Sequence, residues 1–408
     1  VARRIRRYSQ ITGSITLPQF FSNRFHDKRS ILAAIAAVVI IVFFVPYTAA
    51  GFAGCGKLFS SLFGMDYMTA MVISALVIVG YTATGGFLAA SITDLIQSII
   101  MTAAILFVLI FSTVSAGGLG VVLDNAKALP GYLSLTSTYV EATGTSEPYT
   151  FLHILTTLSW GLGYFGMPQV LLRFMAIRRE DELKRARRVA MVWVVISLTA
   201  AIMIGIVGRA LFPTALTTAS EAGNVFIYLS RSLLPAALAG LAMAGILAAT
   251  ISSSDSYLLI AASAFAKNAY QGIFKKNATD KEVMTLSRIM LLVITAIAIV
   301  IALDENSVIF TIVSFAWAGF GATFGPLVLF SLFWKRMTRA GAIAGMLSGG
   351  GMVFIWKLVI KPLGGILGIY ELLPAFIVSS IFIIAVSLLT NAPSKEIQDE
   401  FERVKKGA

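Results

Sequence analysis

Residues 31–55 read ILAAIAAVVIIVFFVPYTAAGFAGC, and this stretch contains no charged side chain. A helix needs about 20 apolar residues to cross the roughly 30 Å hydrocarbon core of a bilayer, so a run of this length predicts a membrane-spanning helix. Similar runs recur along the whole chain. They predict about ten spans, at 31–58, 68–90, 95–117, 151–172, 190–212, 235–265, 285–303, 309–333, 342–360 and 372–391.

The composition of the 408-residue chain supports the same class of protein. Hydrophobic residues make up 58% of it and charged residues 13%, against about 25% charged residues in an ordinary soluble domain. The apolar runs do not alternate and are too long for membrane-spanning strands, which excludes a closed barrel. We therefore expect an all-α polytopic membrane protein, a single transmembrane domain over residues 1–408 with its helical bundle at 31–391.

The basic residues concentrate in alternate connections between the predicted spans. Of the 32 lysines and arginines, 26 lie in one set of connections and six in the other. Because Lys and Arg are retained on the cytoplasmic side, we expect the basic segment 1–30 and the tail 392–408 to be cytoplasmic in a plasma (inner) membrane protein. The connection 118–150 would lie outside. The net charge of +12 then reflects membrane topology, and the lipid bilayer, not nucleic acid, is the expected partner.

The sequence contains no recognisable catalytic or metal-binding constellation. His26 and His153 are not near any Cys, Asp or Glu cluster with metal-site spacing, so no zinc site is predicted. Paired carboxylates, metal ligands, or a nucleophile with its base do not appear together, and we expect no enzyme activity.

The segment 160–168 reads WGLGYFGMP and interrupts an apolar run. Three glycines and a proline within nine residues weaken a helix in mid-membrane and free backbone groups that need partners. One interpretation is a discontinuous helix whose backbone and aromatic rings line a solute cavity. The alternative is a packing kink, because glycine and proline are common in membrane helices.

The segment 249–256 reads ATISSSDS and lies inside another long apolar run. Hydroxyl and carbonyl oxygens are neutral, hard donors that suit Na⁺, and Ala249 and Ser252 are spaced to face one point. The alternative is hydrogen bonding between helices, worth roughly 0.6–2 kcal/mol per pair. Asp255 favours a functional role, because a carboxylate in a bilayer needs a cation, a partner or a proton.

Two further segments depart from the plain hydrophobic pattern. Asp94 has the position of a helix N-cap, with attraction of sodium towards the cytoplasm as the alternative. Residues 316–326, AWAGFGATFGP, carry small side chains that would allow close approach of another helix, with a hinge as the second interpretation.

Taken together, these segments resemble the sodium:solute symporter family, closest to its sodium/proline branch. Each motif alone is weak, but they occur over essentially the whole chain and in the family's order. The resemblance rests on Tyr47 to Gly51, Gly85 to Ala89, Trp160 to Pro168 with Arg173 to Met175, Ile246 to Ser256, and Ala316 to Pro326.

The resemblance implies a leucine-transporter-like inverted-repeat fold that works by alternating access around a site near the membrane midplane. It implies three further helices ahead of Val1, so the chain would be N-terminally truncated and lack its first helices. The implied function is sodium-coupled import of a small solute, with L-proline favoured, Na⁺ as the coupling ion and no permanently bound cofactor.

The resemblance also assigns roles to residues. A sodium site would use the carbonyl oxygen of Ala249 and the hydroxyls of Ser252 and Ser253. Asp94 and Asp255 would belong to the sodium pathway, although some proline transporters have an apolar residue at the latter position. The substrate pocket would be lined by Tyr47, Trp160, Tyr164 and Pro168.

Other functions remain open from the sequence. Within the same fold the solute could be pantothenate, a monocarboxylate, a sugar or iodide. A symporter-like membrane sensor module is a different class, but the tail after Ala392 has only about 17 residues, too few for a kinase-type output domain.

Overall fold

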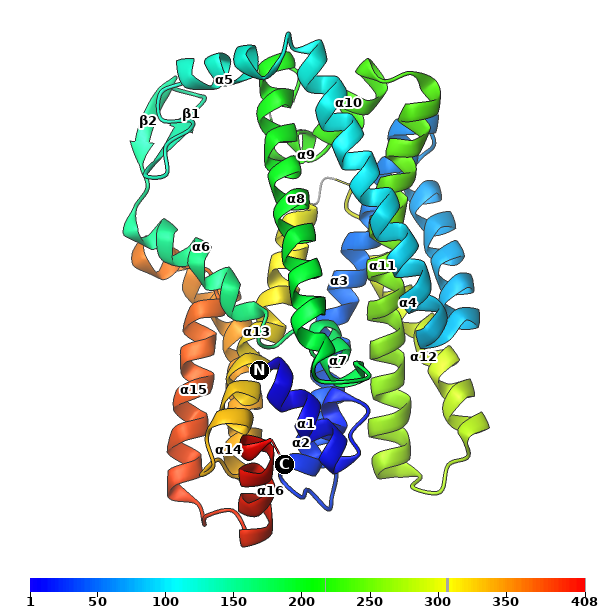
Figure 1. The fold of residues 1–408 in the computed structure, drawn as a ribbon, viewed down its shortest axis with the longest axis vertical. Helices are drawn as coiled ribbons and strands as arrows, with labels where there is room; N and C mark the ends of the chain where they lie inside the picture. Colours follow the sequence, from blue (N-terminus) through cyan, green and yellow to red (C-terminus); the bar gives the residue numbers. More distant parts are fainter. Residues whose placement is uncertain (217, 306–307, 408) are drawn as a thin grey trace.

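The computed structural model describes residues 1–216, 218–305 and 308–407, without the side chains of residues 81, 85–90, 219 and 220. Most of the described chain is helical, as predicted, and the helices form an elongated bundle (Figure 1). The elements in chain order are α1 (Ala2–Thr12), α2 (Leu17–Arg24), α3 (Ile31–Phe63), α4 (Tyr67–Ser115), α5 (Leu119–Ala128), β1 (Ser137–Val140), β2 (Thr145–Pro148), α6 (Phe151–Gly163), α7 (Pro168–Ala176), α8 (Glu182–Leu211), α9 (Ala219–Ala222), α10 (Val225–Leu233), α11 (Ala236–Ser263) with its π-helical extension η1 (Ala264–Phe274), α12 (Asp280–Ile301), α13 (Ile309–Phe333), α14 (Arg339–Ile355) followed by the short turns η2 (Trp356–Ile360), η3 (Lys361–Leu363) and η4 (Gly365–Gly368), α15 (Leu372–Leu389) and α16 (Lys395–Lys406).

Nine helical segments among the described residues are long and apolar enough to cross a membrane. They correspond to nine of the predicted spans. The remaining prediction, 151–172, is wrong as a single span, because α6 ends at Gly163 and α7 begins at Pro168. This is the segment in which three glycines and a proline were expected to weaken a helix, so the interruption itself is confirmed.

The sequence predicts a break between two spans at residues 91–94. This prediction is wrong, because helix α4 continues through these residues. A straight helix would separate Met71 from Val108 by about 55 Å, at 1.5 Å per residue. However, a Cβ added to Gly56 of α3 would lie 2.9 Å from Met71, and Val108 shares an apolar cluster with Leu58 of the same helix. Helix α4 must therefore bend back on itself, so its two apolar stretches are separate crossings (Figure 1).

Among the described residues, a two-stranded hairpin departs from the all-helical prediction. Strands β1 and β2 pair antiparallel, with Ser137 opposite Pro148 and Val140 opposite Thr145. Gly144 takes a φ of 65° in the turn between them. The hairpin lies in the polar connection 118–150, where Thr, Tyr and Val side chains favour strands and no apolar run requires a helix.

Helix α13 forms the buried centre of the bundle. Every residue from Ala316 to Val328 is buried. A Cβ added to Gly319 would lie 2.1 Å from the ring of Phe43 on α3. The predicted role of the small residues at 316–326, which is to let other helices approach closely, is confirmed. The helix also continues without interruption through Pro326.

The two chain ends pack together at one end of the bundle, as a layer of α1, α2 and α16, with the hairpin towards the other end (Figure 1). The guanidinium of Arg24 is buried in this layer and donates from Nε to the carbonyl oxygen of Ser331 at 3.0 Å. It also lies over the rings of Tyr8 and Phe401. Tyr8 is fully buried, and this burial raises its pKa to about 12.

Candidate functional site

The interruption between α6 and α7 is packed against the backbone of α13. A Cβ added to Gly166 would lie 2.2 Å from the carbonyl oxygen of Phe320 and 2.8 Å from the amide nitrogen of Gly325. Only glycine allows two backbones to come this close. Pro168 then starts α7 at a position where its missing N–H costs nothing. Close packing therefore accounts for part of the motif at 160–168.

An aromatic cluster covers the broken helix. The ring of Trp160 stacks on Phe310, Trp317 and Tyr370, with centroid distances of 5.1, 5.8 and 5.4 Å. Tyr164 meets Trp317 edge-on at 4.7 Å and is 58% exposed. The indole N–H of Trp317 donates to the carbonyl oxygen of Trp160 at 3.0 Å, which satisfies one backbone group beside the break. Two of the predicted substrate residues therefore belong to one aromatic surface.

The serine-rich stretch of α11 faces a cavity, not the outside of the bundle. The hydroxyl of Ser252 donates to the carbonyl oxygen of Ala249 at 3.2 Å, so these two oxygens point to the same place. Ser252 and Ser253 line an open cavity of about 580 Å³ between α4, α7, α8 and α11. The side chains around it are Ser91, Asp94, Leu95, Ser98, Met101, Gln169, Arg173, Trp193, Ser252, Ser253, Ser256 and Tyr257.

Asp94 lies on the wall of the same cavity and forms an ion pair. Its Oδ2 is 2.5 Å from Nη2 of Arg173 on α7, and only 13% of its side chain is exposed. The predicted N-cap role is wrong, because Asp94 lies in the interior of α4, whose N-cap is Asp66. An acidic group, a guanidinium and several hydroxyls therefore meet in one cavity that is open at one side.

Asp255 and Ser254 lie behind the cavity wall. Asp255 is 1% exposed, and among the described residues neither of its carboxylate oxygens has a hydrogen bond of ordinary geometry. The hydroxyl of Ser254 is also buried without such a partner in the described part of the chain. A Cβ added to Gly51 would lie 2.3 Å from the Ser254 hydroxyl, so α3 closes over this side of α11. The next residue, Ser256, returns to the cavity.

Tyr47 is connected to this cavity through Tyr257. The two rings are 4.4 Å apart, and Tyr257 lines the cavity that holds Ser252 and Ser253. Pro168 lies instead on a separate small cavity of about 30 Å³, with residues of α2, α3 and α11. Ser252 and Ser253 therefore share one cavity with Asp94, and Ala249 is linked to it through the Ser252 hydroxyl. The four predicted substrate residues lie in different places: Trp160 and Tyr164 in the aromatic cluster, Tyr47 beside Tyr257, and Pro168 on the small cavity.

The sequence alone did not assign roles to several residues of this region. The sequence presents Arg173 only as part of a motif, and its partner Asp94 lies 79 positions away. Trp317 is one of several small and aromatic residues at 316–326, and no local pattern distinguishes Tyr370. The available signals are a basic residue one turn into the helix that follows the break, and an indole N–H in a buried helix that needs an acceptor.

Comparison with known proteins assigns the family. The model of the family described as sodium:solute symporter family matches residues 1–349. The chain belongs to the sodium:solute symporter family. This symporter chain is thus a multi-pass membrane protein, with nine described helical segments able to span a bilayer.

Two relatives of this symporter are proline transporters by name. It is 39% identical to the sodium/proline symporter of Staphylococcus aureus in an alignment of 412 residues. The alignment covers 99% of this chain and 79% of the relative. It is 40% identical over 403 residues to the high-affinity proline transporter PutP of Bacillus subtilis (strain 168), which covers 98% of this chain and 82% of that one.

A solved structure supports the predicted fold. The substrate-bound, outward-open state of a Na⁺-coupled sialic acid symporter aligns with a TM-score of 0.71 at 16% identity, covering 97% of this chain and 84% of that one. At this identity the likeness concerns the fold alone, and it confirms the symporter architecture. The prediction that this chain lacks its first helices stays a prediction.

Proposed function

We propose that this symporter imports L-proline together with Na⁺ by alternating access. The observation that carries the proposal is the placement of Ala249, Ser252 and Ser253. Ser252 and Ser253 line an open cavity that also holds Asp94, and the Ser252 hydroxyl donates to the carbonyl oxygen of Ala249, in a chain of the sodium:solute symporter family. The names of the two relatives favour proline as the solute.

The sodium ion would bind the carbonyl oxygen of Ala249 and the hydroxyls of Ser252 and Ser253. A serine hydroxyl rotates freely, so Ser252 can release Ala249 and offer a lone pair to the ion while both oxygens stay in place. Neutral oxygens suit an ion that must be released again. Asp94 and Asp255 would raise the local Na⁺ concentration along the pathway, with Arg173 limiting the net negative charge.

Proline would bind against Tyr47, Trp160, Tyr164 and Pro168. Aromatic faces suit the apolar pyrrolidine ring, and the freed backbone groups of the break can meet the carboxylate and the ammonium. Tyr257 joins the two sites, because it lines the sodium cavity and contacts Tyr47. Reciprocity then requires Na⁺ to raise proline affinity by the same factor by which proline raises Na⁺ affinity.

We further propose that the chain acts as a single transporter domain over residues 1–408 in the plasma (inner) membrane, without enzyme activity of its own. Both of its ends would be cytoplasmic. The 26 basic residues on one set of connections and the position of both ends at one end of the bundle support this orientation.

The test is uptake of labelled proline at varied Na⁺ concentration. Ser252→Ala should raise the half-saturating Na⁺ concentration by about 10-fold or more, because a contact with a charged group is worth about 1.5–3 kcal/mol. Ser348→Ala is the matched control, because its hydroxyl makes the same bond to the carbonyl of residue i−3, in α14. The control should leave the Na⁺ dependence unchanged.

Two results would refute the coupling: proline uptake that does not need Na⁺, or an unchanged Na⁺ dependence when Ser252→Ala and Ser253→Ala are combined. Competition by pantothenate, monocarboxylates or sugars tests the solute separately. If one of these compounds inhibits uptake of labelled proline at a lower concentration than unlabelled proline does, the assignment of proline as the solute is wrong. Sodium coupling would still hold.

A further inference from the structure

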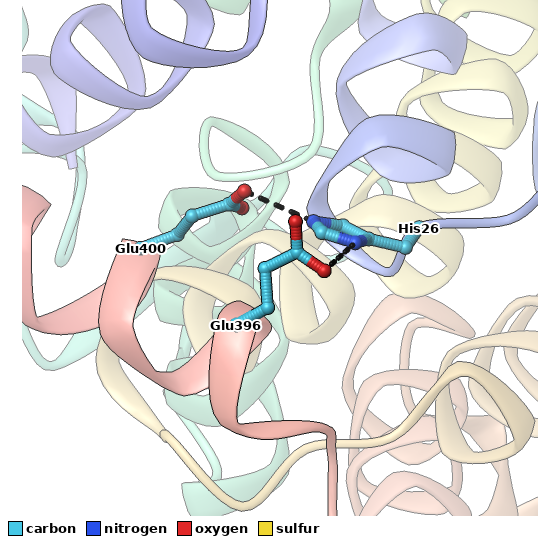
Figure 2. A group of neighbouring side chains, drawn as sticks. All are labelled: His26, Glu396 and Glu400. Carbon is cyan, nitrogen blue, oxygen red and sulfur yellow. Dashed lines mark hydrogen bonds and ion pairs between the residues drawn. The ribbon is translucent and has the colours of Figure 1, made fainter.

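Three potential metal ligands meet in the layer formed by the chain ends, away from the transport cavity (Figure 2). Nε2 of His26 is 3.0 Å from Oε1 of Glu400, and Nδ1 is 3.6 Å from Oε2 of Glu396. One ligand atom from each of the three residues can be chosen so that all lie within 4.8 Å of one another. The histidine and the glutamates are more than 360 positions apart in the sequence.

The local structure presents these side chains to one another. His26 follows α2 in a turn, with a φ of 48°, that is fixed by Asp27, whose carboxylate accepts hydrogen bonds from the amides of Arg29 and Leu32 at 3.2 and 2.7 Å. The two glutamates are four positions apart and therefore share one face of α16. Figure 2 shows both of them directed from α16 at the imidazole.

We propose that His26, Glu396 and Glu400 bind a divalent transition metal ion of the Zn²⁺ type. Zn²⁺ is bound in proteins by imidazole nitrogen and carboxylate oxygen at about 2.0–2.2 Å, and water commonly completes the shell. In the tetrahedral geometry that Zn²⁺ usually adopts, two ligands at such distances lie about 3.4 Å apart. Nε2 and the Glu400 oxygen are 3.0 Å apart, so a small side-chain movement would admit the ion. Oε2 of Glu396 lies 3.6 Å from Nδ1, too far for a hydrogen bond, and the 74% exposed side chain of Glu396 is free to turn an oxygen to the ion.

Charge and hydrogen bonding favour a cation at this place. Oε2 of Glu400 is inaccessible to solvent and has no hydrogen-bond partner among the described residues. The two carboxylates bring two negative charges, while the nearby guanidinium of Arg24 is held at Ser331 and over aromatic rings. A divalent ion would satisfy the free oxygen and the remaining negative charge together.

The ion would join the C-terminal helix to the turn after α2. Helix α16 already packs through Ile397, Phe401 and Val404. The carbonyl of Val404 also accepts a bond from Arg7 at 3.2 Å. Metal binding would add a crosslink near the first turn of α16, and would therefore slow its release from the layer.

The experiment measures Zn²⁺ binding to the purified, chelator-treated protein by isothermal titration, with Mg²⁺ as the comparison ion. The expected result is one Zn²⁺ per chain, with affinity lowered about 10–100-fold by His26→Ala and by Glu400→Gln. His153→Ala is the matched control, because it removes the other histidine of the chain, on α6, and should leave binding unchanged. Zn²⁺ should also slow proteolysis within α16 of the wild type but not of the variants.

The combined variant Glu396→Gln and Glu400→Gln covers the case in which His26→Ala fails to fold, because it changes only carboxylates on the surface helix. Absence of stoichiometric Zn²⁺ binding by the wild type, equal binding by these variants, or loss of binding in His153→Ala would overturn the proposal. So would release of α16 that responds to pH alone and not to Zn²⁺, since the cluster would then be a proton-dependent clamp.

Discussion

Gly166→Ala should destabilise the protein more than an ordinary glycine-to-alanine change in a membrane helix. The added methyl group would lie 2.2 Å from the carbonyl oxygen of Phe320 and 2.8 Å from the amide nitrogen of Gly325. Normal contacts of a carbon atom are near 3.5–4 Å. Gly166 does not have a positive φ, so the whole effect is steric.

The magnitude follows from the kind of atom that is contacted. Overpacking a core with flexible neighbours costs about 1–3 kcal/mol. Here both contacts are backbone atoms of the buried helix α13, so no side-chain rotation can relieve them, and α13 and the α6–α7 break must separate. We expect a loss of about 3 kcal/mol or more in the free energy of unfolding. Proline uptake should fall as well, because Trp160 and Tyr164 adjoin the break.

The assay is unfolding of the purified protein by SDS titration from mild detergent, together with proline uptake in cells. Gly161→Ala is the matched control, because it lies five positions away and a Cβ there would meet no atom within 4 Å. Since alanine favours helix over glycine by up to about 1 kcal/mol, the control should be neutral or slightly more stable. If Gly166→Ala lies within about 0.5 kcal/mol of wild type, the close backbone packing inferred at the break is wrong.

Two other changes test the packing around the site and at the chain ends. Trp317→Phe keeps an aromatic ring but removes the N–H that donates to Trp160 and part of the indole. The free energy of unfolding should therefore fall by about 1 kcal/mol or more in the same titration, and an unchanged value would contradict the role of that bond. Hydrogen bonds from Arg7 hold the pKa of Glu180 below its ordinary value of 4.5. The ion pair therefore stabilises the folded protein fully above about pH 4.5. This stabilisation is lost as the pH falls through the lowered pKa of the folded state. Glu180→Gln should therefore be less stable than wild type by about 0.5–1 kcal/mol at about pH 6, with the difference shrinking towards about pH 3; a pH-independent difference would rule out the charge-based explanation.

The spans were predictable because each depends on a local property. A segment such as 31–55 must be apolar along its whole length to lie in lipid, whatever its neighbours are. The break at 160–168 was predictable for the same reason, since glycine and proline weaken any helix locally. The bend in α4 was harder to predict. The apolar residues predict a loop at 91–94, but the chain stays helical there.

Partners distant in sequence could not be predicted from local pattern. Asp94 matched an N-cap by its neighbours, yet it pairs with Arg173, which only the packing of α7 against α4 brings to 2.5 Å. His26 had no metal-site spacing in the sequence, and its two glutamates come from the other end of the chain. The family resemblance named Ala249, Ser252 and Ser253 as sodium residues, and this role stays a proposal.

The sequence by itself determined that this chain is a helical membrane protein, how its apolar stretches divide, and which family it resembles. The bilayer imposes these features residue by residue, since every backbone polar group in lipid must be satisfied within its own helix. The tertiary structure alone decided which groups meet. It brings Asp94 to Arg173, and the indole of Trp317 to the carbonyl of Trp160. It also brings His26 to Glu400 of the C-terminal helix. Such contacts depend on how closely helices can approach, which is set by glycines on one helix and the atoms of another.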